Sequence, residues 1–220
     1  MATWMTHFRI ADYFLDRIDG IVPEPFIVGN IGPDCGVPNA DWSAFTPPTE
    51  TTHWREAWKD CRCNDFYAAY LDYGDTSPET RSFLLGYYIH LLADNEWDRL
   101  IYRPKRREYK AQFARDKGFI WRFKGDWYVL DHLYLREHPD FRAFRVFASI
   151  GDFHDDTLAY YPEDAYTRQI GCITRFYREY DGELDHEYMY LNRQEMDDFV
   201  EKAVIIIEGD LAGKGILPAP

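Results

Sequence analysis

The chain has 220 residues, of which 46% are hydrophobic, 29% charged and 18% aromatic. Its 25 Lys and Arg residues against 38 Asp and Glu residues give a net charge of −13. That balance excludes a sequence-independent nucleic-acid binder with a basic face, and it argues against docking on an anionic membrane through bulk charge. The length suits one domain over residues 1–220, with enough apolar residues for a core.

No segment of the sequence carries a targeting or membrane signal. The longest aliphatic run, Val204 to Ile207, is far below the ~18 residues that a transmembrane helix needs. Residues 1–7 lack a basic stretch followed by an apolar one. Cys61 and Cys63 form a C-x-C pair instead of C-x-x-C, so free thiols in a cytoplasmic protein are expected.

Hydrophobic periodicity predicts a mostly helical chain, beginning with a helix over residues 4–18 that places His7 on its apolar face. A loop rich in Pro and Gly is expected from about Gly20 to Pro48, followed by a helix from Thr51 to Tyr73. The positions expected to be buried in this second helix are Trp54, Trp58, Phe66, Tyr67 and Tyr70.

The clearest helix start lies at Ser77, a good N-cap residue, with Pro78 in the first helical position. This helix is expected to run to about Tyr102 and to end before Pro104. It is apolar on nearly all sides, which predicts a central helix of the fold.

Shorter elements are expected in the second half of the chain. An amphipathic helix is predicted from Glu108 to Lys117 and a strand-like segment from Phe119 to Lys124. Asp126 is a suitable N-cap for a helix from Trp127 to about Glu137.

The last helix has a capping-box pattern, Asn192 followed by Glu195, and Gly209 is expected to end it. Together the elements predict an all-α fold, a single multi-helix domain with its site between helices and one Gly/Pro-rich loop. The expected strand content is below about 10%.

The central helix carries His90 and Asp94, which share one face because they are four residues apart. An imidazole nitrogen and a carboxylate oxygen at this spacing can reach one metal ion. The alternative is a buried histidine beside a carboxylate. An ionised Asp94 in an apolar helix is costly without a partner, and a metal ion supplies that partner.

Three further side chains are candidates for the same site. His7 lies on a buried stripe, where the alternative is a neutral histidine bonded to a backbone carbonyl. His53 lies near a helix start and is alternatively a surface or capping residue. Asp34 lies among three glycines and a proline, which suits either a loop that aims a carboxylate or an ordinary turn.

Five positions resemble, in order, the metal ligands of the zinc-dependent phospholipase C family, whose wider fold group includes the S1/P1-type nucleases: His7, Asp34, His53, His90 and Asp94. The resemblance covers about residues 4–102 and is most specific from Phe83 to Asp94. It implies an all-helical domain with three zinc ions, two of them bound by these five residues.

Two features of that family are not matched. In secreted members the processed N-terminal Trp gives its amine to a zinc ion. Trp4 lies only three residues before His7 and no signal peptide is expected, so an amine ligand is not expected. The two histidines and one glutamate of the third zinc site are also missing after the central helix. The substitute ligand for this third site is either Asp131, which lies on an inward-facing helical stripe, or Asp98. Each of the two is alternatively an ion-pair or capping residue.

The resemblance implies a metal-dependent hydrolase of phosphate esters, with a phosphate-ester small molecule or phospholipid head group as substrate. Two zinc ions about 3.5–4 Å apart would ionise a water for in-line attack on phosphorus. Asp94 is expected to bridge the ions, and Asp34 to serve as ligand, as the base that orients the water, or as both. Neither a nucleic-acid partner nor stable membrane insertion is expected.

Two other functions remain open. A metal-stabilised helical binding protein without catalysis would fit the loss of a third site. The adjacent His154 and Asp155 are also compatible with an HD-type metal phosphohydrolase. The rings of Trp42, Trp54 and Trp97 lie near the ligands in sequence and either cradle a choline-like cation or pack in the core.

Overall fold

The computed structural model describes residues 1–41, 43–57, 59–72, 74, 76–185 and 187–218. Within these ranges the chain is predominantly helical, and its one sheet is the antiparallel pair of β1 (Val37–Pro38) and β2 (Phe45–Thr46). The predicted all-α fold class is therefore confirmed. None of the described helices is both long enough and apolar enough to cross a bilayer.

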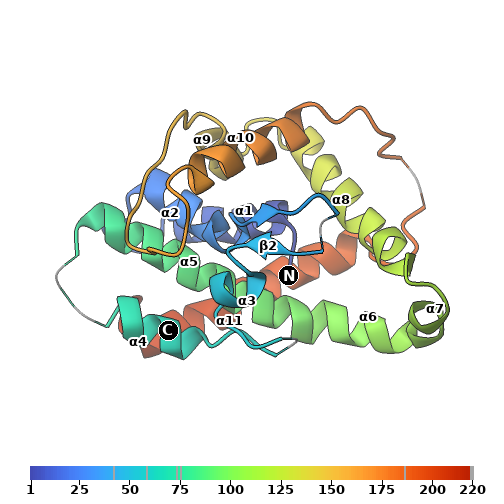
Figure 1. Ribbon diagram of the computed structural model, residues 1–220, viewed down its shortest axis with the longest axis horizontal. Helices are drawn as coiled ribbons and strands as arrows, with labels where there is room; N and C mark the ends of the chain where they lie inside the picture. Colours follow the sequence, from blue (N-terminus) through green and yellow to red (C-terminus); the bar gives the residue numbers. More distant parts are fainter. Residues whose placement is uncertain (42, 58, 73, 75, 186, 219–220) are drawn as a thin grey trace.

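The helices form a bundle around α5, which continues through a π-helical turn, η2, into α6 along one side of the molecule (Figure 1). At the far end of this run the chain turns through α7 and returns as α8. The bounds of the helical elements are α1 (Trp4–Phe14), α2 (Pro23–Ile31), η1 (Gly32–Asp34), α3 (Thr49–Thr52), α4 (Cys63–Tyr70), α5 (Pro78–Trp97), η2 (Asp98–Tyr102), α6 (Arg103–Glu108), α7 (Lys110–Arg115), α8 (Phe119–Glu137), α9 (Arg142–Phe147), α10 (Ala165–Arg178) and α11 (Arg193–Gly213).

Two helix starts lie where the capping residues predict them. The Ser77 hydroxyl accepts the backbone N–H of Thr80 at 3.1 Å and opens α5. Asn192 and Glu195 form the predicted capping box of α11, each side chain accepting the other residue's backbone N–H at 3.0 Å. The predicted end of α11 at Gly209 is wrong, because an internal helical glycine costs only about 1 kcal/mol and the buried face of the helix continues beyond it.

The expected loop from Gly20 to Pro48 is wrong in its first part, which forms α2. A Cβ atom on Gly29 would lie 2.0 Å from the carbonyl oxygen of Phe83, and one on Gly86 would lie 2.1 Å from that of Phe26. Both positions therefore require glycine, because the backbones of α2 and α5 touch there. These glycines allow two helices to pack closely. In a single sequence, a glycine with this role looks the same as a glycine in a turn.

The expected helix from Thr51 to Tyr73 is divided into α3 and α4. Trp54 breaks it with a φ of 49°, a left-handed conformation that helices do not use. The Trp54 ring packs edge-on against Phe66 and Tyr70, at centroid distances of 5.4 and 5.8 Å, so burial of these rings overrides the helical pattern. Trp58 and Tyr73 lie outside the described residues.

The central helical run does not stop before Pro104, as the sequence predicted. Pro104 lies in the first turn of α6, where its missing N–H costs no hydrogen bond. The predicted helix from Glu108 to Lys117 corresponds to the end of α6 and to α7.

The predicted strand from Phe119 to Lys124 is wrong, because α8 is continuous from Phe119. Phe119, Phe123 and Trp127 recur every four residues and form one buried stripe, which favours a helix. Asp126 lies inside α8 and accepts the backbone N–H groups of Tyr190 and Leu191, at 2.6 and 3.2 Å, in place of the predicted capping role.

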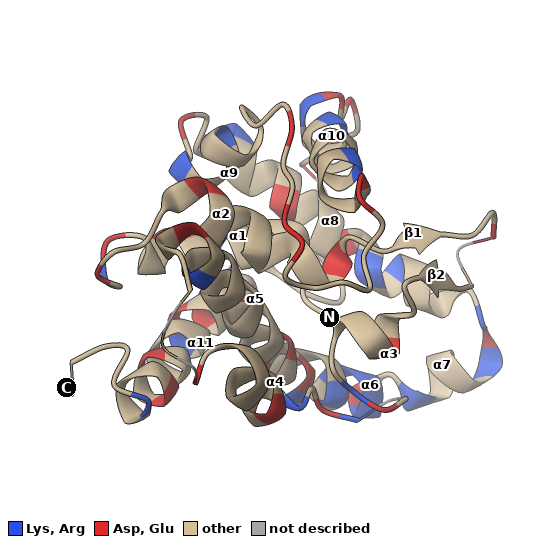
Figure 2. Ribbon diagram, turned by 60° about the vertical axis from the view of Figure 1, so that its left-hand side comes forward, with Lys and Arg blue, Asp and Glu red and all other residues tan. Residues whose placement is uncertain are grey.

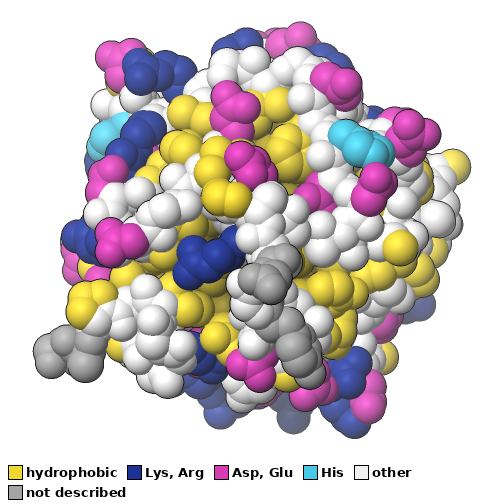
Figure 3. All heavy atoms as spheres, turned by 90° about the vertical axis from the view of Figure 1, so that its left-hand side faces the viewer, with side chains coloured by type: hydrophobic (Ala, Val, Ile, Leu, Met, Phe, Trp, Pro, Cys, Tyr) yellow, Lys and Arg dark blue, Asp and Glu magenta, His cyan; other side chains and the backbone are white. Residues whose placement is uncertain are grey.

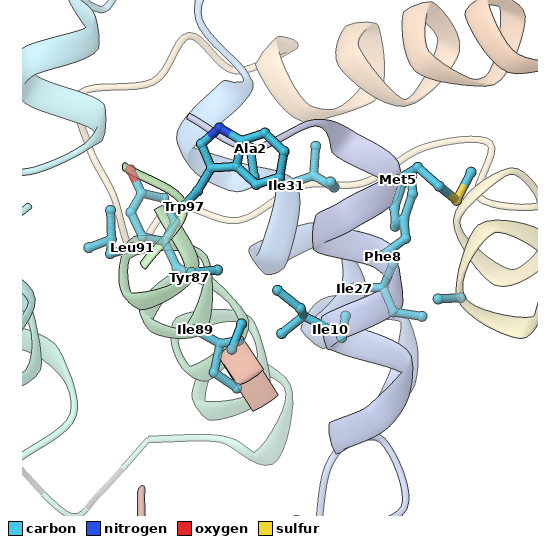
Figure 4. Packing of buried hydrophobic residues seen from close by; sticks show 14 of the residues in the cluster. Ala2, Met5, Phe8, Ile10, Ile27, Ile31, Tyr87, Ile89, Leu91 and Trp97 are labelled. Carbon is cyan, nitrogen blue, oxygen red and sulfur yellow. The ribbon is translucent and has the colours of Figure 1, made fainter. Parts of the chain in front are cut away.

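The core is one cluster of buried aliphatic and aromatic side chains that extends from α1, α2 and α5 to α8, α10 and α11, and Figure 4 shows part of it on the first three helices. Trp97 is fully buried and packs edge-on against Trp127 and Phe199, both at 4.9 Å. Trp97 is therefore a core residue and not part of a cation-binding cage, and Trp42 lies outside the described residues.

Candidate metal centre

The contact between α2 and α5 determines which nitrogen of His90 is free to bind a metal ion. Its Nδ1 lies 2.8 Å from the carbonyl oxygen of Asn30 at the end of α2, so Nδ1 carries the proton and donates it there. The same Asn30 side chain donates to the carbonyl of Gly86 at 3.1 Å, which fixes the contact between the two helices. The Nε2 lone pair of His90 is left free and faces Asp94, one turn further along α5.

Asp94 is the centre of the cluster. Its Oδ1 accepts the backbone N–H of Ala2 at 2.7 Å and lies 3.5 Å from Nε2 of His7. Its Oδ2 lies 3.5 Å from Nε2 of His53 and 3.7 Å from Nε2 of His90. Three imidazoles from three segments of the chain therefore face one carboxylate.

His7 comes to this place because α1 starts at the N-cap residue Thr3 and lies against α5. Its ring stacks on that of His90 with a centroid distance of 3.7 Å and an interplanar angle of 4°. The two rings thus present their Nε2 atoms to Asp94 side by side.

His53 and Asp34 complete the cluster from α3 and η1. Nδ1 of His53 lies 2.9 Å from the hydroxyl of Thr52, and its Nε2 lies 3.4 Å from Oδ1 of Asp34. The Asp34 side chain is 8% exposed, whereas those of Asp94 and His53 are 2% exposed. Asp34 is therefore the member of the group that faces outward most.

The ligand atoms form two overlapping groups that could each hold a metal ion, His7–His90–Asp94 and Asp34–His53–His90. Within each group the atoms lie within 4.8 Å of one another. Among the described atoms, Nε2 of all three histidines and Oδ2 of Asp94 are buried without a hydrogen-bond partner. Leaving so many buried polar atoms unpaired is costly, and a set of nitrogen and oxygen donors suits zinc, so these residues fit the ion.

Charge states in the cluster also suit metal binding. Burial and the neighbouring His90 lower the pKa of His7 to about 4, and burial lowers that of His53. Burial alone would lower the pKa of His90, but the Asp94 carboxylate outweighs it and the pKa is raised. Burial acts to raise the pKa of Asp94, yet the amino terminus, His7 and His90 hold it well below its usual range. The pKa of Asp34 is likewise lowered by His53 and His90, although burial acts to raise it.

Asp131 lies apart from the two groups. Its carboxylate accepts the hydroxyl of Thr3 at 2.7 Å and that of Tyr177 at 2.9 Å, and burial raises its pKa to about 7 despite these bonds. The structure therefore ties Asp131 to the start of α1, and its assignment as a metal ligand stays a prediction. Asp98, the alternative, pairs with Arg103.

The amino terminus lies closer to the cluster than the sequence analysis expected. The amino nitrogen of Met1 is 4.0 Å from Oδ1 of Asp94, beside the hydrogen bond from Ala2.

A basic residue that the sequence did not indicate, Lys124, interacts electrostatically with carboxylates of the cluster. It is half-buried on α8, and no carboxylate of the described residues lies within 4.0 Å of its ammonium group. Burial lowers its pKa, and the carboxylates that oppose this effect are Asp34 and Asp94. Lys124 shares one helical face with Tyr128 and Asp131 at spacings of four and three residues, a signal that the predicted strand over 119–124 concealed.

The alternative pair His154 and Asp155 lies in an exposed loop. His154 is 51% exposed and its Nε2 is 3.0 Å from Asp156, which raises its pKa. Neither residue belongs to the metal-ligand groups found among the described residues.

Fold and site together define a helical protein with a buried cluster of histidine and aspartate side chains that could hold a metal ion. A family model described as zinc-dependent phospholipase C matches residues 6–187, which include every candidate ligand. The chain belongs to the zinc-dependent phospholipase C family. Neither the curated proteins nor the solved structures gave a match.

Proposed function

We propose that this protein is a zinc-dependent hydrolase of phosphoric diesters, with a phospholipid head group or a related phosphate ester as substrate. The observation that carries the proposal is the set of unpartnered ligand atoms on His7, His53, His90 and Asp94, buried in a chain of this family. The two ligand groups share the one free nitrogen of His90, which can bind a single ion, so the groups support at least one ion. The four free thiols are compatible with the cytoplasmic location inferred from the sequence.

Asp34 is the proposed catalytic residue. A zinc ion bound at this site would draw electron density from the phosphoryl oxygens and would make a neighbouring water more acidic. Asp34 is the most outward-facing carboxylate of the cluster, and its lowered pKa keeps it ionised at neutral pH. It can therefore orient the attacking water and accept its proton.

Lys124 is proposed to complement the charge of the substrate. A phosphodiester brings a negative charge to a site where Asp34 and Asp94 are already negative. Asp34 and Asp94 both favour the charged form of Lys124. The positive charge of its ammonium group lowers the electrostatic cost of binding the anionic substrate. It also stabilises the additional charge that develops on the phosphoryl oxygens.

Metal analysis followed by a substrate screen tests the proposal. Protein purified without chelator is expected to contain zinc and to hydrolyse phosphodiesters such as a short-chain phosphatidylcholine, with activity lost on chelation and restored by zinc. Zinc content near zero, both as purified and after reconstitution, contradicts the metal centre. Zinc-loaded protein with no activity on phosphomonoesters or phosphodiesters contradicts catalysis and supports the non-catalytic binding protein.

A further inference from the structure

Basic side chains are concentrated in one segment of this acidic chain. Residues 103–124, called here the basic segment, contain nine Lys or Arg and two Asp or Glu residues, a net charge of +7. The rest of the chain has 16 basic and 36 acidic residues, a net charge of −20. The total of −13 therefore conceals a strong separation of charge along the sequence.

The fold turns this separation into a surface at one end of the molecule. The basic segment comprises α6, α7 and the start of α8, which lie together at the end away from α4 and the C-terminus (Figure 1). Lys and Arg colour much of α6 and the end of α7 in Figure 2, whereas Asp and Glu are distributed over the other elements. The opposite end of the molecule mixes basic, acidic and apolar side chains (Figure 3).

Most of these cations form no ion pair in the described part of the chain. Arg103, Lys105 and Arg122 form ion pairs. Five others are without a carboxylate within 4.0 Å in the part of the chain that the structure describes: Arg106, Arg107, Lys110, Arg115 and Lys117. Arg106 packs its guanidinium over the Phe113 ring at 4.9 Å, and the remaining four are exposed.

An exposed aromatic side chain lies within the same surface. Trp121, at the start of α8, is 61% exposed, although this protein buries most of its large aromatic rings. The ammonium group of Lys124 lies 5.9 Å from its ring centroid. An exposed Trp among Lys and Arg residues is typical of surfaces that contact the interfacial region of a bilayer, where the ring lies among head groups and the cations meet phosphates.

We propose that the basic segment is the surface by which this protein docks on an anionic phospholipid bilayer, with Trp121 as the residue that enters the interface. The segment is complementary to such a surface because its five cations without a carboxylate neighbour act within a Debye length, where the distant acidic residues are screened. The choice of a lipid surface over another polyanion rests on the proposed function. A bilayer is where a phospholipase C finds its substrate.

Binding to vesicles tests the proposal without reference to catalysis. The full-length protein is sedimented with phosphatidylcholine vesicles, with or without about a third of phosphatidylserine, at salt concentrations from about 0.1 to about 0.5 M. Binding is expected only with phosphatidylserine and is expected to weaken as salt rises. The triple variant K110Q/R115Q/K117Q is expected to bind about 100-fold more weakly, at roughly fivefold per charge. The single variant Trp121→Ala is expected to bind the vesicles about tenfold more weakly than the unmodified protein.

The matched control is R145Q/R175Q/R178Q, which removes three exposed arginines from α9 and α10. It changes the net charge equally, and its vesicle binding is expected to stay within about threefold of the unmodified protein. Equal binding to both vesicle types, or an equal loss in both triple variants, overturns the proposal. Single-stranded DNA bound more tightly than vesicles through the same three residues also overturns it. Vesicle binding by a protein inactive on all phosphodiesters would contradict the proposed function and leave the docking surface standing.

Discussion

The cluster around Asp94 illustrates how a few side chains acquire metal-binding properties from their neighbours. Either nitrogen of a neutral histidine can carry the proton, but in His90 the Nδ1–H group donates to the carbonyl of Asn30, which leaves the lone pair of Nε2 directed at the site. Asp94 in turn is held ionised in a buried place by the amino terminus, His7 and His90, and its Oδ1 accepts the Ala2 N–H group. The reactivity belongs to this arrangement and not to any one residue type.

Asp34→Asn tests whether Asp34 acts in chemistry. The substitution keeps the size of the side chain and removes its negative charge, so phosphodiester turnover is expected to fall at least about 100-fold. The free energy of unfolding is expected to change by only about 1 kcal/mol. Zinc content measured on the same sample separates a base from a ligand, since only loss of a ligand lowers it. Unchanged turnover with unchanged zinc would assign Asp34 to a structural turn.

Lys124 is expected to contribute to binding of the phosphate anion. Lys124→Gln keeps most of the side chain and removes the charge, and kcat/KM for a phosphodiester is expected to fall about tenfold, or 1.4 kcal/mol. Lys124→Arg is expected to retain most of the activity. Equal loss in both variants would show that the position matters for packing and not for charge.

Asp131 is expected to make stability depend on pH near neutrality. Burial raises its folded-state pKa to about 7, above the ~3.9 of an unfolded aspartate. The folded state therefore holds a proton that the unfolded chain releases. The resulting stabilisation is fully present below about pH 4 and is lost as the pH rises through about 7. In chelated protein, the free energy of unfolding is expected to fall more steeply between pH 5 and 8 than in Asp131→Asn. Identical slopes would exclude this role.

At the scale of elements, the pair α2 and α5 determines the site. Glycines at 29 and 86 let the two backbones touch, and this contact brings the carbonyl of Asn30 to the ring of His90. Asp34 follows directly at the end of η1, so the same contact sets its position relative to α5. A packing feature of two helices thus controls the geometry of the ligands.

Gly86→Ala is expected to destabilise the protein strongly. Its new methyl group would lie 2.1 Å from a backbone oxygen of α2, and neither helix can shift cheaply. A loss of about 3 kcal/mol is expected, at the upper end of overpacking effects. Gly209→Ala in α11 is the matched control, because nothing lies within 4 Å of its added Cβ and alanine favours a helix by about 1 kcal/mol. Chemical denaturation measures both, and comparable effects would contradict the close contact.

At the scale of the whole molecule, the ligands come from four separate segments of the chain, so metal binding and folding are coupled. An ion that binds only the folded arrangement of α1, η1, α3 and α5 stabilises all four together. Without it, the unpartnered buried atoms of the cluster reduce the stability of the core around them.

Zinc is therefore expected to raise the melting temperature. At a free zinc concentration of 100 times Kd the stabilisation is about 2.7 kcal/mol. For a chain of this size that corresponds to a shift of about 5 to 11 °C. His90→Ala is expected to lower zinc content and to abolish the shift, whereas His154→Ala, in an exposed loop, is expected to retain both. A shift of equal size in the two variants would place the bound zinc elsewhere.

The sequence by itself determined the helical class of this fold, the starts of α5 and α11, and the five residues that meet at the centre. The class and the helix starts follow from local physics, since capping and periodicity act within a few residues, and the five residues follow from the resemblance of their order to the ligands of the zinc-dependent phospholipase C family. Tertiary structure decided what depends on distant contacts: that the Gly-rich segment is a helix, that α8 begins at Phe119, and that Lys124 interacts electrostatically with carboxylates of the cluster. A glycine pressed against another backbone has the same local signature as a glycine in a turn, and only the partner helix distinguishes them.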